Sequence, residues 1–201
     1  MPENKNLLLI FTRNPEPGKV KKRLASSIGD EPALEIYKFL LKHTSEITKD
    51  LPVHKEVYYS ERIEKEDLWN ETYGEKLQKG EDLGERMKNA FQNGFESGYR
   101  NIIIIGSDLF EITKDDLEEA FNALENSDYV IGPAKDGGYY LLGMKTLNLK
   151  LFKNKSWSTA SVFEDTIKDI NSKHITILEK RNDIDVFEDI RDVPVFQQFL
   201  K

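Results

Sequence analysis

Four consecutive isoleucines at residues 102–105 constrain the fold of this chain more than any other stretch. A β-branched run without polar alternation is typical of a strand covered on both faces, as in the middle of a parallel sheet. The run leads through a glycine into Ser107 and Asp108. Open α/β sheets bind ligands at the carboxyl ends of their strands, so Asp108 is a candidate metal or phosphate-site residue. The alternative role, a cap for the next helix, is better filled by Thr113, which has Asp116 three residues later.

The composition indicates one soluble domain over residues 1–201, with a substantial core. Charged residues make up 32% of the chain, and no apolar run approaches the roughly 20 residues of a membrane helix. The short apolar run near the N-terminus leads into a charged loop, so we expect no signal peptide. Cysteine is absent, which excludes disulfides, Cys-ligated metals and a thiol nucleophile and fits a cytoplasmic location. The net charge of -7 argues against binding to nucleic acid.

Apolar runs alternate with helical periodicity along the chain, which predicts an α/β fold with a mostly parallel sheet. We expect further strands at residues 7–11, 53–59, 128–133, 137–144 and 175–178. Helices are expected around residues 34–41, at 82–99, after Thr113, at 159–170 and after Asp185, the last one interrupted at Pro194. Residues 61–80 are polar and predict a short helix or an irregular excursion.

A basic loop follows the first strand and therefore lies at the ligand edge of the sheet. Pro15, Pro17 and Gly18 break any helix there, and the loop and the residues after it carry five cations: Arg13, Lys19, Lys21, Lys22 and Arg23. Arginine and lysine beside a helix start are suited to a polyphosphate. The chain has neither a Walker A sequence nor a dinucleotide GxGxxG after its first strand. A solvated basic patch is the alternative interpretation.

Four aspartates follow predicted strands and are candidate ligands: Asp108, Asp136, Asp183 and Asp185. Magnesium is usually held by one or two carboxylates together with substrate phosphates. Asp183 and Asp185 could instead supply negative charge to the start of the last helix. Gly137 and Gly138 allow either close approach of a ligand or an ordinary tight turn. The three histidines, His43, His54 and His174, show no metal-ligand spacing, and we expect no zinc site.

Five segments together carry a resemblance: PGKVKKRLASSIG, LQKGEDLGERM, IIIIGSD, GPAKDGGYYLLG and DIDVFEDI. In this order the chain resembles the bacterial "transferase 1, rSAM/selenodomain-associated" family, and more distantly 2-phospho-lactate and molybdenum cofactor guanylyltransferases and sugar-1-phosphate uridylyltransferases. The resemblance implies a single-domain, Rossmann-like, three-layer α/β/α fold with a mixed, mostly parallel sheet, of the nucleotide-diphospho-sugar transferase (GT-A) type.

The resemblance also implies roles for particular residues. Catalysis would fall to Lys21, Arg23 and Asp108, and Mg²⁺ or Mn²⁺ would bind Asp108 and Asp185. The acceptor or sugar would face Asp136, Gly137, Gly138 and Tyr139. The nucleotide would contact the first loop, the segment that meets the base in related enzymes, and the end of the isoleucine strand: Thr12, Arg13, Gly18, Lys19, Lys21, Arg23, Gln78, Leu83, Gly84 and Ser107.

The leading hypothesis is therefore Mg²⁺-dependent transfer of a nucleotidyl group from a nucleoside triphosphate to a small phosphate or carboxylate metabolite. Transfer of a sugar from a nucleotide-sugar stays open, although a DxD motif is missing because residue 110 is phenylalanine. A non-catalytic nucleotide-binding module in a pathway assembly is a rival of a different class, and we expect no nucleic-acid or membrane partner. Replacing Asp108 by asparagine should sharply reduce metal-dependent nucleotide binding. Stability without ligand should stay unchanged or rise, because repulsion from Asp136 and Asp185 is relieved.

Overall fold

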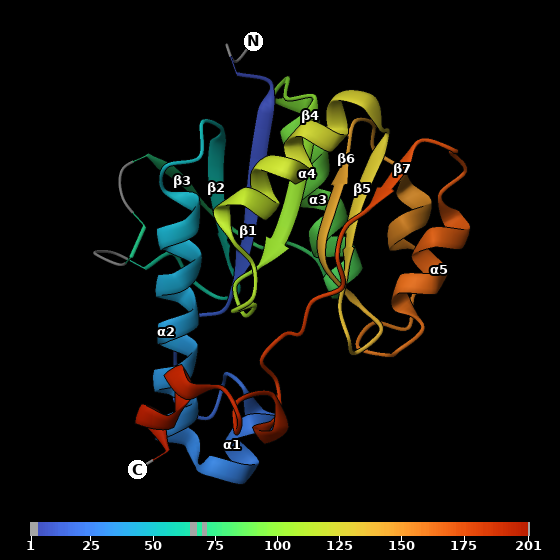
Figure 1. Cartoon of the computed structure of the whole chain (residues 1–201). Coiled ribbons are helices and arrows are strands. Elements are labelled where there is room, and N and C mark those ends of the chain that lie inside the picture. Colours follow the sequence, from blue (N-terminus) through green and yellow to red (C-terminus); the bar gives the residue numbers. More distant parts are fainter. Residues whose placement is uncertain (1–3, 65–67, 70–71, 201) are drawn as a thin grey trace.

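The isoleucine run is the central strand of a seven-stranded sheet with the order β3-β2-β1-β4-β6-β5-β7 (Figure 1). The computed structural model describes residues 4–64, 68–69 and 72–200. The strands are β1 (Asn6–Thr12), β2 (His54–Tyr59), β3 (Tyr73–Leu77), β4 (Asn101–Gly106), β5 (Tyr129–Pro133), β6 (Tyr139–Met144) and β7 (Ile175–Ile177). Only β6 runs antiparallel to its neighbours β4 and β5. The predicted mixed, mostly parallel sheet is confirmed.

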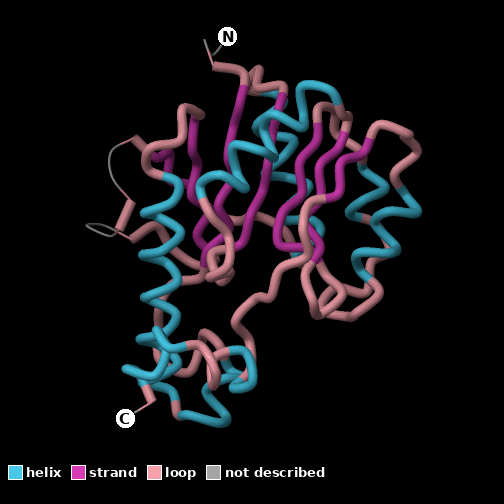
Figure 2. Tube along the Cα trace, viewed as in Figure 1, coloured by secondary structure: helices cyan, strands magenta, loops and turns pink. Residues whose placement is uncertain are grey.

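Helices cover both faces of this sheet, as predicted for a three-layer fold (Figure 2). They are α1 (Lys22–Ile28), α2 (Asp30–Thr48), α3 (Leu83–Glu96), α4 (Lys114–Asn126) and α5 (Val162–Asp169), with short 3-10 helices at Leu149–Phe152, Phe187–Asp189 and Pro194–Phe199. The Thr113 side chain accepts a hydrogen bond from the Asp116 backbone, in the capping box that the sequence predicts. None of the described helices is long and apolar enough to cross a bilayer.

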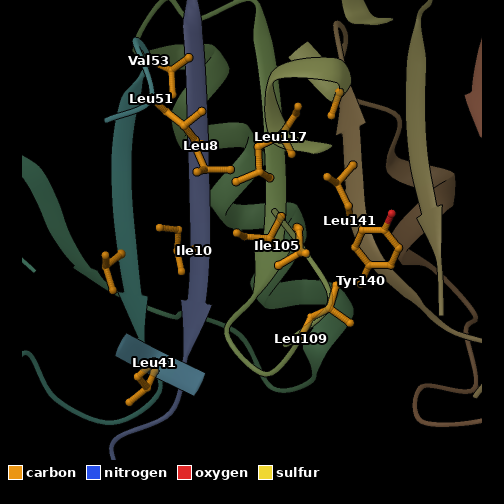
Figure 3. Packing of buried hydrophobic residues seen from close by; sticks show 14 of the residues in the cluster. Leu8, Ile10, Leu41, Leu51, Val53, Ile105, Leu109, Leu117, Tyr140 and Leu141 are labelled. Atoms are coloured by element: carbon orange, nitrogen blue, oxygen red, sulfur yellow. The ribbon is translucent and has the colours of Figure 1, made fainter. Parts of the chain in front are cut away.

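The isoleucines divide between the two faces because side chains alternate along a strand. Ile103 and Ile105 pack with residues of α2 and α4, in the cluster that Figure 3 shows around Leu8 and Leu117. Ile102 and Ile104 pack with residues of α3 on the opposite face. All four side chains are at most 4% exposed. A strand that is apolar on both faces is therefore explained by two separate layers of helix.

A third apolar cluster lies below the sheet in Figure 1 and joins α1 and α2 to the C-terminal segment. It includes Leu24, Ile36 and Leu40 from the two helices and Ile184, Ile190 and Phe196 from the C-terminal segment. The Phe196 ring lies 5.7 Å from Phe39 of α2 and 5.2 Å from Phe110. This cluster holds α1, and with it the basic residues, beside the segment that follows β7 (Figure 1).

Three details differ from the sequence prediction. The described part of residues 61–80 contains an edge strand, β3, and the expected C-terminal helix is replaced by two 3-10 turns. The basic segment also forms a separate short helix, α1, which ends at Gly29 before α2 begins. The His43 ring links α2 to the loop before α4, because its Nε2 lies 2.9 Å from the carbonyl of Ile112.

Candidate functional site

Two strand ends meet at the lower edge of the sheet in Figure 1 and position the candidate site. β1 and β4 are adjacent and parallel, with Phe11 opposite Gly106. The hydroxyls of Thr12 and Ser107 lie 3.2 Å and 3.3 Å from the hydroxyl of Tyr37 in α2. Each of the two side chains is 4% exposed. These hydroxyls form a buried cluster that fixes both strand ends, and the predicted contact of Thr12 and Ser107 with a nucleotide stays a prediction.

The start of the basic loop is held by Asn14, a residue that the sequence analysis did not single out. Its amide donates hydrogen bonds of 2.8 Å to the Arg62 carbonyl and to the Glu64 carboxylate. Its oxygen accepts a hydrogen bond from the Glu61 backbone N–H at 3.0 Å. Asn14 is 3% exposed, and a buried polar residue with full hydrogen bonding is a structural anchor. No periodicity surrounds it, which is why the pattern of the sequence did not reveal it.

The middle of the loop is exposed and turned outward. Gly18 has a φ of 69°, in the left-handed region. The ammonium of Lys19 lies 2.6 Å from Glu16 and 3.2 Å from Glu61, and its side chain is 52% exposed. Carboxylates on the surface therefore already partner Lys19, and its predicted role toward a phosphate stays a prediction.

Lys21 and Asp108 form the central contact of the site. The Lys21 Nζ donates to Asp108 Oδ2 at 3.0 Å, and the Lys21 side chain is 5% exposed while that of Asp108 is 46% exposed. Lys21 has a φ of 46° and a ψ of 44°, an uncommon left-handed conformation for a residue with a Cβ. Burial alone would raise the pKa of Asp108, but the charge and hydrogen bond of Lys21, with the charge of Arg13, hold that pKa below its ordinary value.

Arg23 and Asp185 form a second pair at the same edge. Their side chains are 2.6 Å apart, with Arg23 71% exposed. Asp189 shapes the segment around Asp185 by accepting hydrogen bonds of 2.8 Å from the backbone N–H groups of Asp185 and Val186. The Ile184 N–H donates to the Asp108 carbonyl at 3.2 Å. The two predicted metal aspartates therefore belong to adjacent segments, and each is paired with a predicted phosphate-binding cation.

A pocket of about 300 Å³ opens beside these pairs. Three carboxylates line it: Asp108, Asp136 and Asp183. Burial, with the neighbouring charges of Asp108 and Asp136, raises the pKa of Asp183 to about 6. Asp185 is not among the described residues that line the pocket. Asp183 thus shares the pocket with Asp108, and the metal-ligand role predicted for Asp185 stays a prediction.

The carboxylates suit a divalent cation that is bound together with phosphates. Within residues 4–64, 68–69 and 72–200, no group of three or more His, Asp or Glu side chains is arranged as a complete metal site. Magnesium needs only one or two carboxylates when a substrate phosphate supplies further oxygens. Asp108 and Asp183 are such a pair; the pKa of Asp183 is raised first by burial and then by the charges of Asp108 and Asp136, and a cation would offset those charges.

The residues predicted to contact the base lie in two different environments, the ends of two strands and the wall of the pocket. The amide nitrogen of Gln78 donates to the carbonyls of Thr12 and Tyr58, at 2.9 Å each, and so ties the ends of β1 and β2 together. Leu83 lines the pocket and is 44% exposed. Gly84 lies against the Trp157 ring. A Cβ on Gly84 would stand 2.5 Å from Cζ2 of that ring, so a larger residue would force the indole to shift.

The segment predicted to face the acceptor forms a tight turn at the pocket. The Asp136 carboxylate accepts a hydrogen bond from the Gly138 N–H at 2.8 Å. Gly137 has a φ of 92°, and a Cβ on it would stand 2.2 Å from the carbonyl oxygen of Ala160. Asp136, Gly138 and Tyr139 line the pocket, whereas Gly137 shapes the turn; their predicted contact with an acceptor stays a prediction. Trp157 also lines the pocket. This single aromatic residue in a polar stretch was the signal that the sequence analysis passed over.

The sheet order, the layers and the ligand edge define the fold of the nucleotide-diphospho-sugar transferases and cytidylyltransferases. The chain belongs to the family described as "Uncharacterized protein conserved in bacteria (DUF2064)", whose model matches residues 43–159. The narrower resemblance to the rSAM/selenodomain-associated transferases stays a prediction. No match was found among curated proteins.

Solved structures with this fold include one relative of substantial identity. A protein from Desulfovibrio desulfuricans G20, provisionally named a nucleotide-diphospho-sugar transferase, is 30% identical, with a TM-score of 0.84 over 91% of this chain and 83% of its own. The 4-diphosphocytidyl-2C-methyl-D-erythritol synthase of Anaerococcus prevotii DSM 20548 is 12% identical, with a TM-score of 0.63 over 96% of both chains. The manganese complex of Rv0371c from Mycobacterium tuberculosis H37Rv is 8% identical, with a TM-score of 0.57 over 98% of both chains.

Proposed function

We propose that this chain is a divalent-metal-dependent transferase that takes a nucleoside triphosphate and passes its nucleotidyl group to a small-molecule acceptor. The observation that carries the proposal is the meeting of Lys21 and Arg23 with Asp108 and Asp185 at the ligand edge of the sheet. Cations suit phosphates and carboxylates suit a metal, and the site offers both beside a pocket for a second substrate. The name of the Desulfovibrio relative supports a nucleotide-using transferase.

Lys21 and Arg23 would bind the phosphates by exchanging their carboxylate partners for phosphate oxygens. Lys21 is the fixed cation, because its buried side chain and its left-handed backbone leave it few other positions. Arg23 is exposed and can follow the ligand. Its planar guanidinium can donate two hydrogen bonds to one phosphate group.

Asp108 and Asp183 would hold the metal, Mg²⁺ or Mn²⁺, in this scheme. When bound, such an ion neutralises charge on the phosphate oxygens and aligns them for displacement. The ion would also relieve the repulsion among the pocket carboxylates that raises the pKa of Asp183. Asp185 would not bind the metal and would pair with Arg23 in the ligand-free protein.

The transfer forms a bond between an acceptor oxygen and the α-phosphorus and breaks the bond from that phosphorus to the bridging oxygen. The electron pair leaves with pyrophosphate, whose charge Lys21 and Arg23 would stabilise. A hydroxyl acceptor also loses a proton. That proton passes to water at the open side of the pocket.

Transfer of a sugar from a nucleotide-sugar is the second candidate, favoured by the provisional name of the relative at 30% identity. The same cations would then stabilise a departing nucleoside diphosphate. The two reactions differ in their products, because one releases pyrophosphate and the other a nucleoside diphosphate.

Calorimetric titration of nucleoside triphosphates and nucleotide-sugars, with Mg²⁺ and with a chelator, tests the proposal. We expect metal-dependent binding in the wild type and about tenfold weaker binding in Arg23→Ala, as for the loss of one charge-assisted hydrogen bond. Arg100→Ala is the matched control. Arg100 is an exposed arginine that directly precedes β4, at the opposite end of that strand from the site. Equal affinity of wild type and Arg23→Ala would remove the phosphate role. Nucleotide binding with no release of pyrophosphate or nucleoside diphosphate for any acceptor offered would favour the non-catalytic nucleotide-binding module.

A further inference from the structure

The pocket has an apolar wall that neither the metal nor the phosphates would use. Its apolar side is built from β1, α3, β6, the stretch before α5 and the start of α5: Phe11, Leu83, Met87, Tyr139, Trp157 and Val162. Trp157 belongs to the apolar cluster on this face of the sheet and also lies against Gly84. Aromatic rings and a thioether give a surface for an apolar or cationic group, not for a phosphate.

The charged side chains among the described residues that line the pocket are all acidic, and Tyr139, Tyr140, Ser158 and Thr159 add hydroxyls. Of the described residues that line it, three are aspartates and none is lysine, arginine or histidine. Lys21 offsets Asp108, and the metal would take Asp108 and Asp183. Asp136 is then left at the exposed rim, where one of its oxygens accepts the Gly138 N–H at 2.8 Å. An anionic group placed beside Asp136 would be repelled by its carboxylate.

The Tyr139 hydroxyl is a further unused polar group on the apolar wall. Its partner among the described contacts is the sulfur of Met87 at 3.9 Å, a weak acceptor. Burial raises the pKa of Tyr139, so the phenol stays protonated and can donate. A ligand that reaches this wall can therefore offer one oxygen or nitrogen lone pair as well as an apolar body.

We propose that the pocket binds an acceptor with an apolar body and a protonated amino group, the body against Trp157 and Tyr139 and the ammonium at Asp136. An ammonium beside aromatic rings and a carboxylate gains both cation–π and ionic attraction. The assignment of this molecule as the acceptor rests on the proposed function, whereas its binding does not. The proposal departs from the phosphate or carboxylate acceptor expected from the sequence.

Three probes of one shape test the charge that the pocket selects: phenethylamine, 2-phenylethanol and phenylacetate. Ethylamine is the fourth probe, since it has the ammonium without the ring. Each is titrated into ¹⁵N-labelled wild-type protein without nucleotide, first with a chelator and then with Mg²⁺. We expect phenethylamine to bind at least about tenfold more tightly than phenylacetate in both conditions, with 2-phenylethanol between them and ethylamine weakest of the cations.

The two tryptophans provide an internal control for the place of binding. The indole N–H signal of Trp157 should shift with phenethylamine, and that of Trp69, which is 8% exposed in another cluster, should not. Asp136→Asn should remove most of the preference for the amine. Asp115→Asn, which changes an exposed aspartate in the first turn of α4, should keep it.

Phenylacetate binding as tightly as phenethylamine, or an unmoved Trp157 signal, would overturn the proposal. A preference for the amine that Asp115→Asn removes equally would also overturn it, because it would then reflect the overall charge of -7. Nucleotide binding is measured separately. Its absence alongside an intact amine preference would contradict the proposed function and leave the pocket assignment standing.

Discussion

Replacing Asp108 by asparagine should destabilise the ligand-free protein, which reverses the expectation from the sequence alone. From the sequence, the dominant effect is repulsion among Asp108, Asp136 and Asp185. In the structure, Asp108 instead accepts a hydrogen bond from the Lys21 ammonium at 3.0 Å. Asparagine keeps the shape of the side chain but leaves that buried ammonium without a negative partner.

The magnitude follows from how deeply the two partners are buried. Removing one partner of a fully buried pair costs about 3–5 kcal/mol, whereas exposed pairs contribute about 0–1 kcal/mol. Lys21 is 5% exposed and Asp108 is 46% exposed, so the pair lies between these limits. We expect Asp108→Asn to lower the free energy of unfolding by about 1–3 kcal/mol at neutral pH.

The pH dependence has a definite sign. The pKa of Asp108 is lowered in the folded protein, so its stabilising contribution is complete above the unfolded pKa of about 3.9. That contribution is lost as the pH falls through the folded pKa. The difference between wild type and Asp108→Asn should therefore shrink in acid.

Urea unfolding in the presence of a chelator, at pH 7 and in acid, measures this difference. A double-mutant cycle with Lys21→Met isolates the pair, and Asp115→Asn serves as the surface control. We expect the two site substitutions to be clearly non-additive. An Asp108→Asn protein as stable as wild type, or an additive cycle, would refute the ion-pair reasoning. In parallel titrations, equal Mg²⁺ dependence of nucleotide binding in both proteins would remove the metal assignment.

Two further predictions concern neighbours of this pair. Gln78→Ala leaves the carbonyls of Thr12 and Tyr58 without their donor, so urea unfolding should show a loss of about 1–3 kcal/mol, and calorimetry should show equal weakening for all nucleotides. A change confined to one base would instead make Gln78 a base-reading residue. The pKa of Asp183 is raised to about 6, so its ionised form destabilises the fold as the pH rises from the unfolded pKa of about 3.9 through about 6. Asp183→Asn should raise stability in a chelator by up to ~3 kcal/mol at pH 7 and have little effect near pH 4, and a lower stability at pH 7 would contradict this.

Much of the fold was predictable because its signals are local. The four isoleucines required a strand with two covered faces, and α2, α3 and α4 supply the covers. Thr113 and Asp116 lie three residues apart, and their capping box forms where that spacing predicts it. The edge strand β3 had no such signal, since its pattern of exposure is mostly polar and it pairs along one side only.

The charged residues of the candidate site were predictable from the sequence, but the ion pairs that they form were not. The basic loop and the aspartates are visible as residues, but Lys21 meets Asp108 across 87 positions and Arg23 meets Asp185 across 162. Such pairings depend on how α1 and the C-terminal segment pack together below the sheet. The choice between Asp183 and Asp185 likewise depends on which side chain of a short irregular segment turns into the pocket, and no periodicity specifies this.

The pairing of cations with carboxylates also explains why, on the proposed function, metal and nucleotide should bind as one unit. A metal ion alone would have to displace Lys21 from Asp108, which leaves a buried ammonium unpaired. A nucleotide alone would draw Lys21 and Arg23 away from their aspartates and would bring phosphates close to bare carboxylates. When both arrive together, Lys21 and Arg23 gain phosphate oxygens and Asp108 gains the metal, and Asp185 is left to solvent. The two ion pairs of the ligand-free site are therefore exchanged together, and each ligand removes a cost that the other would meet alone.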